Sequence, residues 1–159
     1  MDQHYVTNRF DYVKILVSPL RRSIQTAIDI LAGHRQIASG ACLVLYPYLT
    51  ERINDLDSVP LTRRELTEYT AYLEAKNDGL VFDYTFLDAL PRRNLWFVEI
   101  LQDESLKKHL LSELLEEGER DCEDNEKILS VLKATCQQRG LEGIGALYRR
   151  VSKLKRLLK

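Results

Sequence analysis

The sequence predicts an all-α protein, a helical bundle built from short helices. Nearly every segment repeats its apolar residues at helical spacing, and no run alternates as a strand would. The 159 residues include seven Gly and four Pro, which are too few for a turn-rich all-β protein. Apolar residues make up 45% and charged residues 30% of the chain, so we expect a folded core and not disorder.

Three helices are expected before residue 57, over Tyr5–Val17, Leu20–Ala32 and Gln36–Ile53. The first should stop before Pro19, because the residue preceding a proline disfavours helical backbone. The second should end at Gly33, a typical helix-terminating residue. The third has an apolar centre, Ala41–Tyr46, which is typical of a buried helix, and Pro47 should kink or break it.

Residues 57–61 are interpreted as a linker between an N-terminal helical segment, residues 1–56, and a second unit, residues 62–159. The second unit opens on Thr62-Arg63-Arg64-Glu65, a capping box in which the Thr and Glu side chains satisfy free backbone N–H groups. Six helices are expected in it: one from Thr62 to Asn77, one over Leu80–Leu90, one capped by Asn94, one capped by Asp103, one capped by Asp124 or Asn125 that ends near Gly140, and one over Leu141–Leu158. A single nine-helix bundle that includes residues 1–56 is the alternative.

The cysteines and histidines predict no metal, cofactor or catalytic residue. The spacing of Cys42, Cys122 and Cys136 fits neither a disulfide framework nor a zinc site, so we expect reduced thiols in the cytosol. The three histidines lack metal-binding spacing, and no phosphate-binding or nucleophile motif is present. The N-terminus lacks signal-peptide features, and the longest apolar stretch is too short to span a bilayer. We therefore expect a cytoplasmic protein with no transmembrane segment.

The net charge of −1 conceals two segments of opposite charge. Residues 113–127 hold eight acids and two bases, a net charge of −6, whereas residues 149–159 hold six bases and no acid. Such runs are usually solvated surfaces, and acids near a helix start or bases near a chain end also suit the helix dipole. The functional interpretation is that one copy's acidic segment binds another copy's basic segment, a head-to-tail contact that forms rings or filaments.

These two segments supply the candidate interface residues. The acidic surface is expected to comprise Glu113, Glu116, Glu117, Asp121 and Glu123. The basic surface is expected to comprise Arg139, Arg149, Arg150 and Lys153. A basic C-terminal helix would also suit nucleic acid or an anionic membrane surface. No base-reading element or set of stacking aromatics accompanies it, so a protein partner, including a second copy, is favoured over nucleic acid.

Several leucine-rich segments of the C-terminal half carry a family resemblance. Leu110–Glu117, Asp124–Leu132 and Arg139–Ile144 resemble the fourth helix, the fifth helix and the entry into the sixth helix of a death effector domain, in the six-helix death-fold superfamily. Leu61–Glu65 and Arg93–Phe97 resemble the related caspase recruitment domain. The charged Arg-x-Asp-Leu pattern of the death effector domain appears here with its acid one place late, at Glu142.

The resemblance implies a non-enzymatic adaptor or regulator that assembles with like domains in apoptotic or innate immune signalling. We therefore predict homotypic protein–protein interaction as the function. One alternative is an enzyme or ligand-binding protein with a polar pocket around His109 or Cys122. Another is a viral or microbial protein with a Bcl-2-like bundle that binds and blocks a host signalling protein, in which Ala41–Tyr46 would form the buried central helix.

Overall fold

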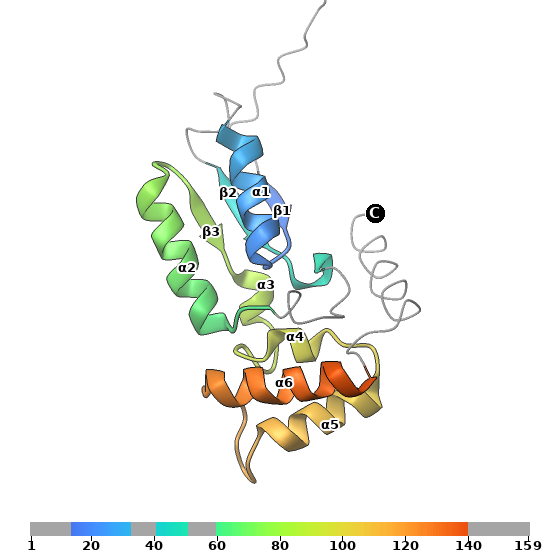
Figure 1. Ribbon diagram of the computed structural model, residues 1–159. Coiled ribbons are helices and arrows are strands. Elements are labelled where there is room, and N and C mark those ends of the chain that lie inside the picture. The colour runs from blue at the N-terminus through green and yellow to red at the C-terminus, as the bar shows by residue number, and fades with distance from the viewer. Residues whose placement is uncertain (1–13, 33–40, 51–59, 140–159) are drawn as a thin grey trace, which may run out of the picture.

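The computed structural model describes residues 14–32, 41–50 and 60–139, and these form a mixed α/β structure (Figure 1). The all-α prediction is therefore wrong. Strands β1 (Lys14–Val17), β2 (Cys42–Leu45) and β3 (Val81–Asp83) pair in parallel, in the order β1-β2-β3. The expected 62–159 unit contains β3, and β2 lies on the other side of the expected linker, so one sheet joins both parts of the chain.

Two of the strands lie where helices were expected in the N-terminal part of the chain. Residues 14–17, expected at the end of a first helix, form β1, and the rest of that helix lies outside the described residues. The apolar centre of the expected third helix forms β2, in which all four side chains are buried. A central parallel strand is covered on both faces, so its sequence is a continuous apolar run. The 3₁₀ turn η1 (Pro47–Leu49) follows β2 directly.

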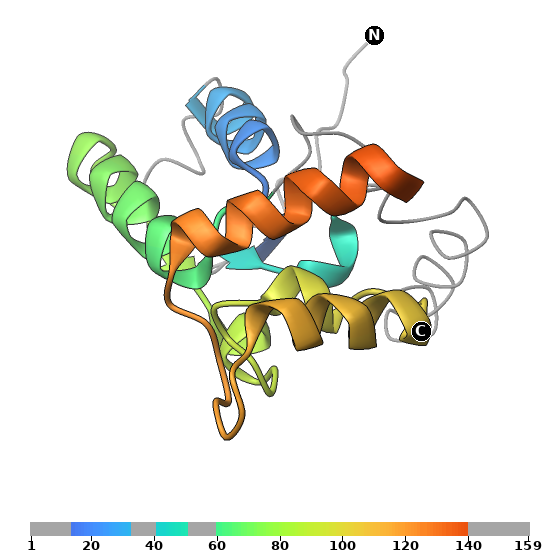
Figure 2. The same cartoon turned by 60° about the horizontal axis from the view of Figure 1, so that its bottom comes forward.

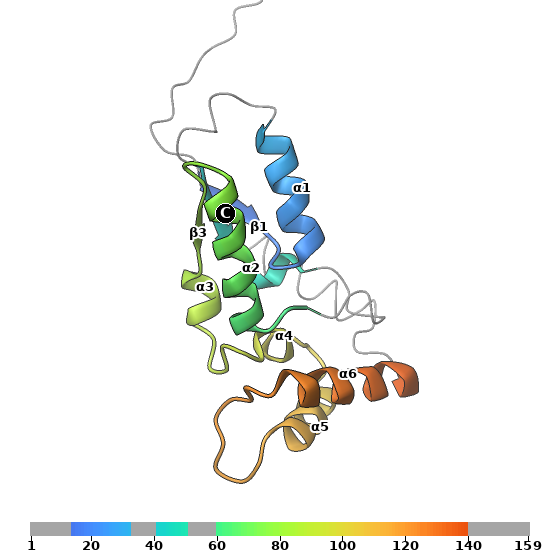
Figure 3. The same cartoon turned by 60° about the vertical axis from the view of Figure 1, so that its left-hand side comes forward.

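Two long helices cover one face of the sheet. Helix α1 (Arg21–Ala32) confirms the expected second helix, and α2 (Arg63–Lys76) confirms the capping box. The strand order never reverses, so crossovers of the usual right-handed sense place both helices on the same side. Figure 3 shows α1 and α2 together on that side. Their apolar residues, such as Ile24 and Leu66, share one core with Leu43 and Phe82 of the sheet.

The outer edge of β3 is held by a side chain of α2. Val81 donates its backbone N–H to the carbonyl of Ala41, beside β2. The next N–H along, that of Phe82, faces away from β2 because successive strand residues alternate in direction. It donates to Oε1 of Glu74 at 2.9 Å. The Glu74 carboxylate therefore fixes α2 to the sheet at the level of β3.

The second part of the described chain is helical. It comprises α3 (Thr85–Asp88), α4 (Trp96–Glu99), α5 (Glu104–Leu114) and α6 (Asn125–Arg139). The expected caps at Asp103 and Asp124 are confirmed, since each carboxylate accepts backbone N–H groups of the following turn. The expected helix over residues 80–90 is replaced by β3 and the single turn of α3. The expected helix over residues 141–158 lies outside the described residues.

This helical part lies beyond the carboxyl ends of the strands (Figure 1). Trp96, fully buried in α4, donates its indole N–H to the carbonyl of Leu61 at 2.8 Å, which ties α4 to the entry of α2. Helices α5 and α6 pack beside each other, and the chain between them projects from the molecule (Figure 2). Neither a six-helix death fold nor a Bcl-2-like bundle describes this arrangement, because three strands and two crossover helices form its first half.

Candidate functional site

A polar cleft of about 440 Å³ opens where α2 begins. Its lining comprises three arginines (Arg63, Arg64, Arg93), three acids (Asp88, Asp121, Glu123), Thr67 and Asn94. These residues come from α2, from α3, from the loop before α4 and from the chain between α5 and α6. We name this feature the arginine cleft. It brings together two segments, Leu61–Glu65 and Arg93–Phe97, that are thirty residues apart in sequence.

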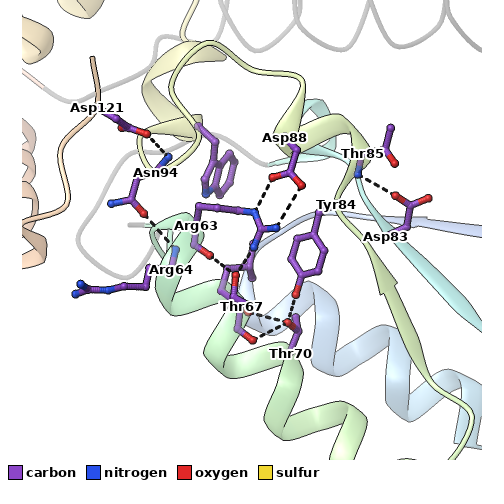
Figure 4. A network of polar contacts seen from close by, with 12 residues as sticks. Arg63, Arg64, Thr67, Thr70, Asp83, Tyr84, Thr85, Asp88, Asn94 and Asp121 are labelled. Atoms are coloured by element: carbon purple, nitrogen blue, oxygen red, sulfur yellow. Dashed lines mark hydrogen bonds and ion pairs between the residues drawn. The ribbon is translucent and has the colours of Figure 1, made fainter. Parts of the chain in front are cut away.

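Asn94 connects the segments that line the cleft by hydrogen bonds. It is 7% exposed, and its Oδ1 accepts a hydrogen bond from the backbone N–H of Arg64 at 3.1 Å. Its Nδ2 donates to the carbonyl of Cys122 at 2.6 Å. Its own backbone N–H donates to Oδ2 of Asp121 at 2.8 Å (Figure 4). One buried amide therefore joins three separate segments of the chain.

This bonding corrects the expectation that Asn94 caps the helix that follows it. The N-cap position of α4 is Leu95, which has no side-chain cap, and Asn94 instead caps α2. Thr62 and Glu65 complete the capping box at the same helix end. Because the side chains of Asn94 and Thr62 already accept two of the free N–H groups, this helix end is largely occupied and is a poor site for a bound anion.

Arg63 is fixed in place on the wall of the cleft. Its Nε donates to Oδ1 of Asp88 at 3.0 Å, and its Nη1 donates to Thr67. The guanidinium carbon also lies 3.7 Å from the ring centroid of Tyr84, within cation–π range. Figure 4 shows these side chains as one connected group. Arg63 and Asp88 therefore satisfy each other and leave little for a ligand.

Tyr84 is structural in the same group. Its hydroxyl shares a hydrogen bond with Thr70, which in turn donates to the carbonyl of Leu66 at 2.9 Å. Burial raises the pKa of Tyr84, and this effect outweighs the hydrogen bond with Thr70 and the charge of Arg63, which both lower it. The phenol therefore stays protonated at neutral pH, so it does not act there as a general base.

Three charged groups on the cleft remain without internal partners. Arg64, Arg93 and Glu123 are exposed, and in the part of the chain that the structure describes their side chains have no hydrogen bond or ion pair. Figure 4 shows the Arg64 side chain extending away from the bonded group around Arg63. The arginine cleft therefore presents two free guanidinium groups and one free carboxylate to solvent.

The expected acidic surface lies on and beside the projecting α5–α6 connection. Glu113 is exposed on α5, and Glu116, Glu117 and Glu123 are exposed on the connection itself. The Glu116 side chain is 79% exposed, and its nearest cation is Nζ of Lys127 at 3.9 Å. At this exposure such a pair contributes little energy. We name Glu113, Glu116, Glu117 and Glu123 the acidic surface.

Asp121, the fifth expected acid, differs from the others. It is half-buried, and its two carboxylate oxygens accept the backbone N–H groups of Asn94 and Cys122. It therefore fixes the loop against the cleft. Of the expected basic residues, Arg139 is the last residue of α6, and its side chain is not described. Arg149, Arg150 and Lys153 lie outside the described residues.

A buried charge cluster supports the loop before α4. The Glu99 carboxylate, 6% exposed, pairs with Arg92 and, at 2.8 Å, with Nζ of Lys107. Burial raises the pKa of Glu99, but the hydrogen bonds from Lys107 and Arg92 outweigh it, so the net shift is downward. A second lowered pKa belongs to Asp83, because its carboxylate accepts hydrogen bonds from Thr85, with a smaller contribution from Lys14.

The other candidate sites have fewer converging polar groups than the arginine cleft. The enzyme alternative required a polar pocket at His109 or Cys122, yet His109 is exposed, and Cys122 is buried with its thiol near the carbonyl of Asp124. An apolar cavity of about 180 Å³ lies at the amino end of the sheet, beside Leu31, Ala41 and Leu80. Among residues 14–32, 41–50 and 60–139, no group of three or more His, Cys, Asp and Glu could hold a metal ion.

Sequence reasoning missed Arg64 and Arg93 as candidate functional residues. The available signal was that each stands in one of the two segments resembling a caspase recruitment domain, but their juxtaposition depends on the long-range bond of Asn94. No helix in the described ranges has the length and apolar character to cross a membrane. No protein-family model, curated protein or solved structure matches the chain.

Proposed function

We propose that the protein is a non-enzymatic adaptor that works through homotypic protein–protein interaction, with the acidic surface as one contact. The observation that carries the proposal is the concentration of exposed carboxylates on a projecting connection. Glu116, Glu117 and Glu123 are exposed on this connection, and the closest cation to Glu116 is 3.9 Å away. Grouped like charges repel one another, and a basic surface on another molecule relieves that repulsion on binding.

The chemistry of the arginine cleft favours binding over catalysis. Asp121 is half-buried and accepts two backbone N–H groups, and Asp88 is paired with Arg63. The phenol of Tyr84 is held protonated. The groups left free are charged side chains at the surface, which suit recognition of a complementary surface. The described residues include a three-stranded sheet, whereas the death-fold family is all-α, so this fold lends no support to a role in apoptotic or innate immune signalling.

The test is reversal of charge at the exposed tip of the acidic surface. Glu116→Lys combined with Glu117→Lys should abolish self-association, measured by sedimentation velocity across a range of protein and salt concentrations. Wild-type association should weaken as salt rises, because exposed charges are screened within about 10 Å at 0.1 M. Self-association that survives the double reversal at low salt would overturn the proposal, and so would a wild-type protein that stays monomeric at every concentration.

A matched control separates this local effect from a change in net charge. Glu68 on α2 and Asp78 after it are exposed acids remote in sequence from the α5–α6 connection. Glu68→Lys combined with Asp78→Lys changes the net charge by the same amount as the test variant. We expect this control to associate as wild type does. Equal loss in both variants would indicate a net-charge effect and contradict a localised contact.

A further inference from the structure

We infer that the arginine cleft receives the acidic surface of a second copy, so that two copies close into a two-fold dimer. This inference rests on the proposed function and names its partner surface. Arg64 and Arg93 would each face carboxylates of the partner's α5–α6 connection, chiefly Glu116 and Glu117. The partner's cleft would receive the same residues of the first copy in return.

The hydrogen bonds of the cleft identify which of its charges are available. Arg63 is committed to Asp88, and Asp121 to two backbone N–H groups. Counting all six charged residues, the cleft is neutral. Counting only the side chains without internal partners, it carries two positive groups and one negative group. The available charge is therefore positive, and a carboxylate is the ligand that a pair of guanidinium groups fits.

The two arginines are held near each other by the backbone. Asn94 follows Arg93 directly and binds the backbone N–H of Arg64, so the two side chains leave neighbouring stretches of backbone and line the same cleft. Asn94 is buried, and the loop that bears Arg93 is further fixed by the ion pair between Arg92 and Glu99. A site whose backbone is already ordered loses less entropy on binding than a flexible one.

The acidic surface adjoins the cleft, and Glu123 belongs to both, which favours a two-fold contact. Asp121 lines the cleft and lies two residues after Glu119 and four after Glu117. At about 3.5 Å per residue, the Cα atoms of Glu117 and Asp121 are at most about 14 Å apart. A two-fold interface uses one self-complementary surface on both copies, and a surface that holds both charges this close together meets that requirement. The head-to-tail ring or filament expected from the sequence needs complementary patches on different faces.

A charge swap tests the inference. The first variant, Arg64→Glu with Arg93→Glu, is called the cleft variant and gives an acidic cleft facing an acidic surface. The second, Glu116→Arg with Glu117→Arg, is called the surface variant and gives a basic surface facing a basic cleft. We expect each variant alone to have a dimer dissociation constant raised at least about tenfold. Mixed in equal amounts they should form a heterodimer, because both contacts then pair opposite charges. Sedimentation velocity and native mass spectrometry distinguish these species.

The outcomes separate this inference from the proposed function. Normal association of the cleft variant, with loss in the surface variant, would overturn the inference and leave the proposed function standing. The same holds if Arg149→Glu with Arg150→Glu removes association while the cleft variant keeps it. Failure of the mixture to form a heterodimer would also overturn it, as would wild-type oligomers that grow beyond two copies. Association that survives in the surface variant at low salt would overturn both.

Two controls keep the test specific. Lys108→Glu with Lys133→Glu changes the same number of charges at exposed positions of α5 and α6, and it should dimerise as wild type does. Urea unfolding of each variant checks that the fold persists. Arg64 is at the second position of α2, where the helix dipole stabilises a negative side chain. Reversing the charge of Arg64 should therefore leave the helix intact.

Discussion

The side chain of Asn94 accepts a hydrogen bond from the backbone N–H of Arg64, 3.1 Å away and thirty residues earlier in the chain. The first turn of α2 is thus capped by a residue of a different segment. The buried amide of Asn94 therefore links the start of α2, the loop before α4 and the α5–α6 connection by hydrogen bonds. The stability of the sheet part and the shape of the arginine cleft are coupled through it.

Asn94→Ala should lower the free energy of unfolding by about 2–3 kcal/mol, since it leaves a helix N–H and the carbonyl of Cys122 without their partners. Urea unfolding followed by the fluorescence of Trp96 measures it. Asn94→Asp keeps an acceptor for Arg64 and should lose part of this energy. A loss below about 0.5 kcal/mol in the alanine variant would contradict the assigned role.

Thr62→Ala should destabilise the protein by about 1 kcal/mol, because the Thr62 hydroxyl accepts the backbone N–H of Glu65 at the start of α2. Thr62→Ser retains the hydroxyl and serves as the matched control. Thermal unfolding by circular dichroism compares the two variants. If both lose the same stability, packing of the Thr methyl group and not the cap would be responsible.

Leu43→Ala should cost about 3 kcal/mol, because Leu43 is fully buried in the central strand and faces the core. Ile30→Ala on α1 is the control, since Ile30 is 59% exposed, and its change should stay within about 0.5 kcal/mol. Chemical unfolding of the two variants gives the comparison. Similar losses at the two positions would be incompatible with the sheet and helix packing described above.

Glu99→Gln should destabilise the protein by about 2 kcal/mol at pH 7, because it weakens the pairing with Arg92 and Lys107. The folded pKa of Glu99 is lowered, so the ionised group contributes its full stability above the unfolded pKa of about 4.3. That contribution is lost as pH falls through the lower, folded pKa. The difference between wild type and variant should therefore shrink as the pH falls below about 4.

Urea midpoints measured from pH 7 to pH 2 follow this difference. Glu68→Gln, at an exposed position of α2, is the control and should differ little from wild type throughout. A stability gap between Glu99→Gln and wild type that does not change with pH would show that the pKa of Glu99 is the same in the folded and unfolded protein, and would contradict the stabilising pairs with Arg92 and Lys107.

The elements that the sequence predicted correctly are those with local signals. The capping box at Thr62 and the caps at Asp103 and Asp124 involve residues two or three positions apart, so they are visible in the sequence. The strands were missed because a buried parallel strand and a buried helix both appear as apolar runs. The apolar segment over residues 41–46 is only six residues long and is followed by Pro47. Six residues is the typical length of a strand.

The candidate site was predictable only in part. The acidic surface followed from a run of like charges, and Glu116 and Glu117 are indeed exposed. The inward bonding of Asp121 could not be read from that run, because its partner Asn94 lies 27 residues earlier. The arginine cleft was missed for the same reason. Its two free guanidinium groups come from segments that only the tertiary fold brings together.

The bond between Glu74 and the backbone of Phe82 restricts how other molecules engage the sheet. An unprotected outer strand offers its main-chain donors to any extended peptide, which is a common route to strand addition and to aggregation. Here α2 supplies a carboxylate to the outward donor in the middle of β3, so a foreign strand would have to displace it. Recognition at this border of the molecule is thereby left to side chains, whose identity can be selective in a way that backbone pairing is not.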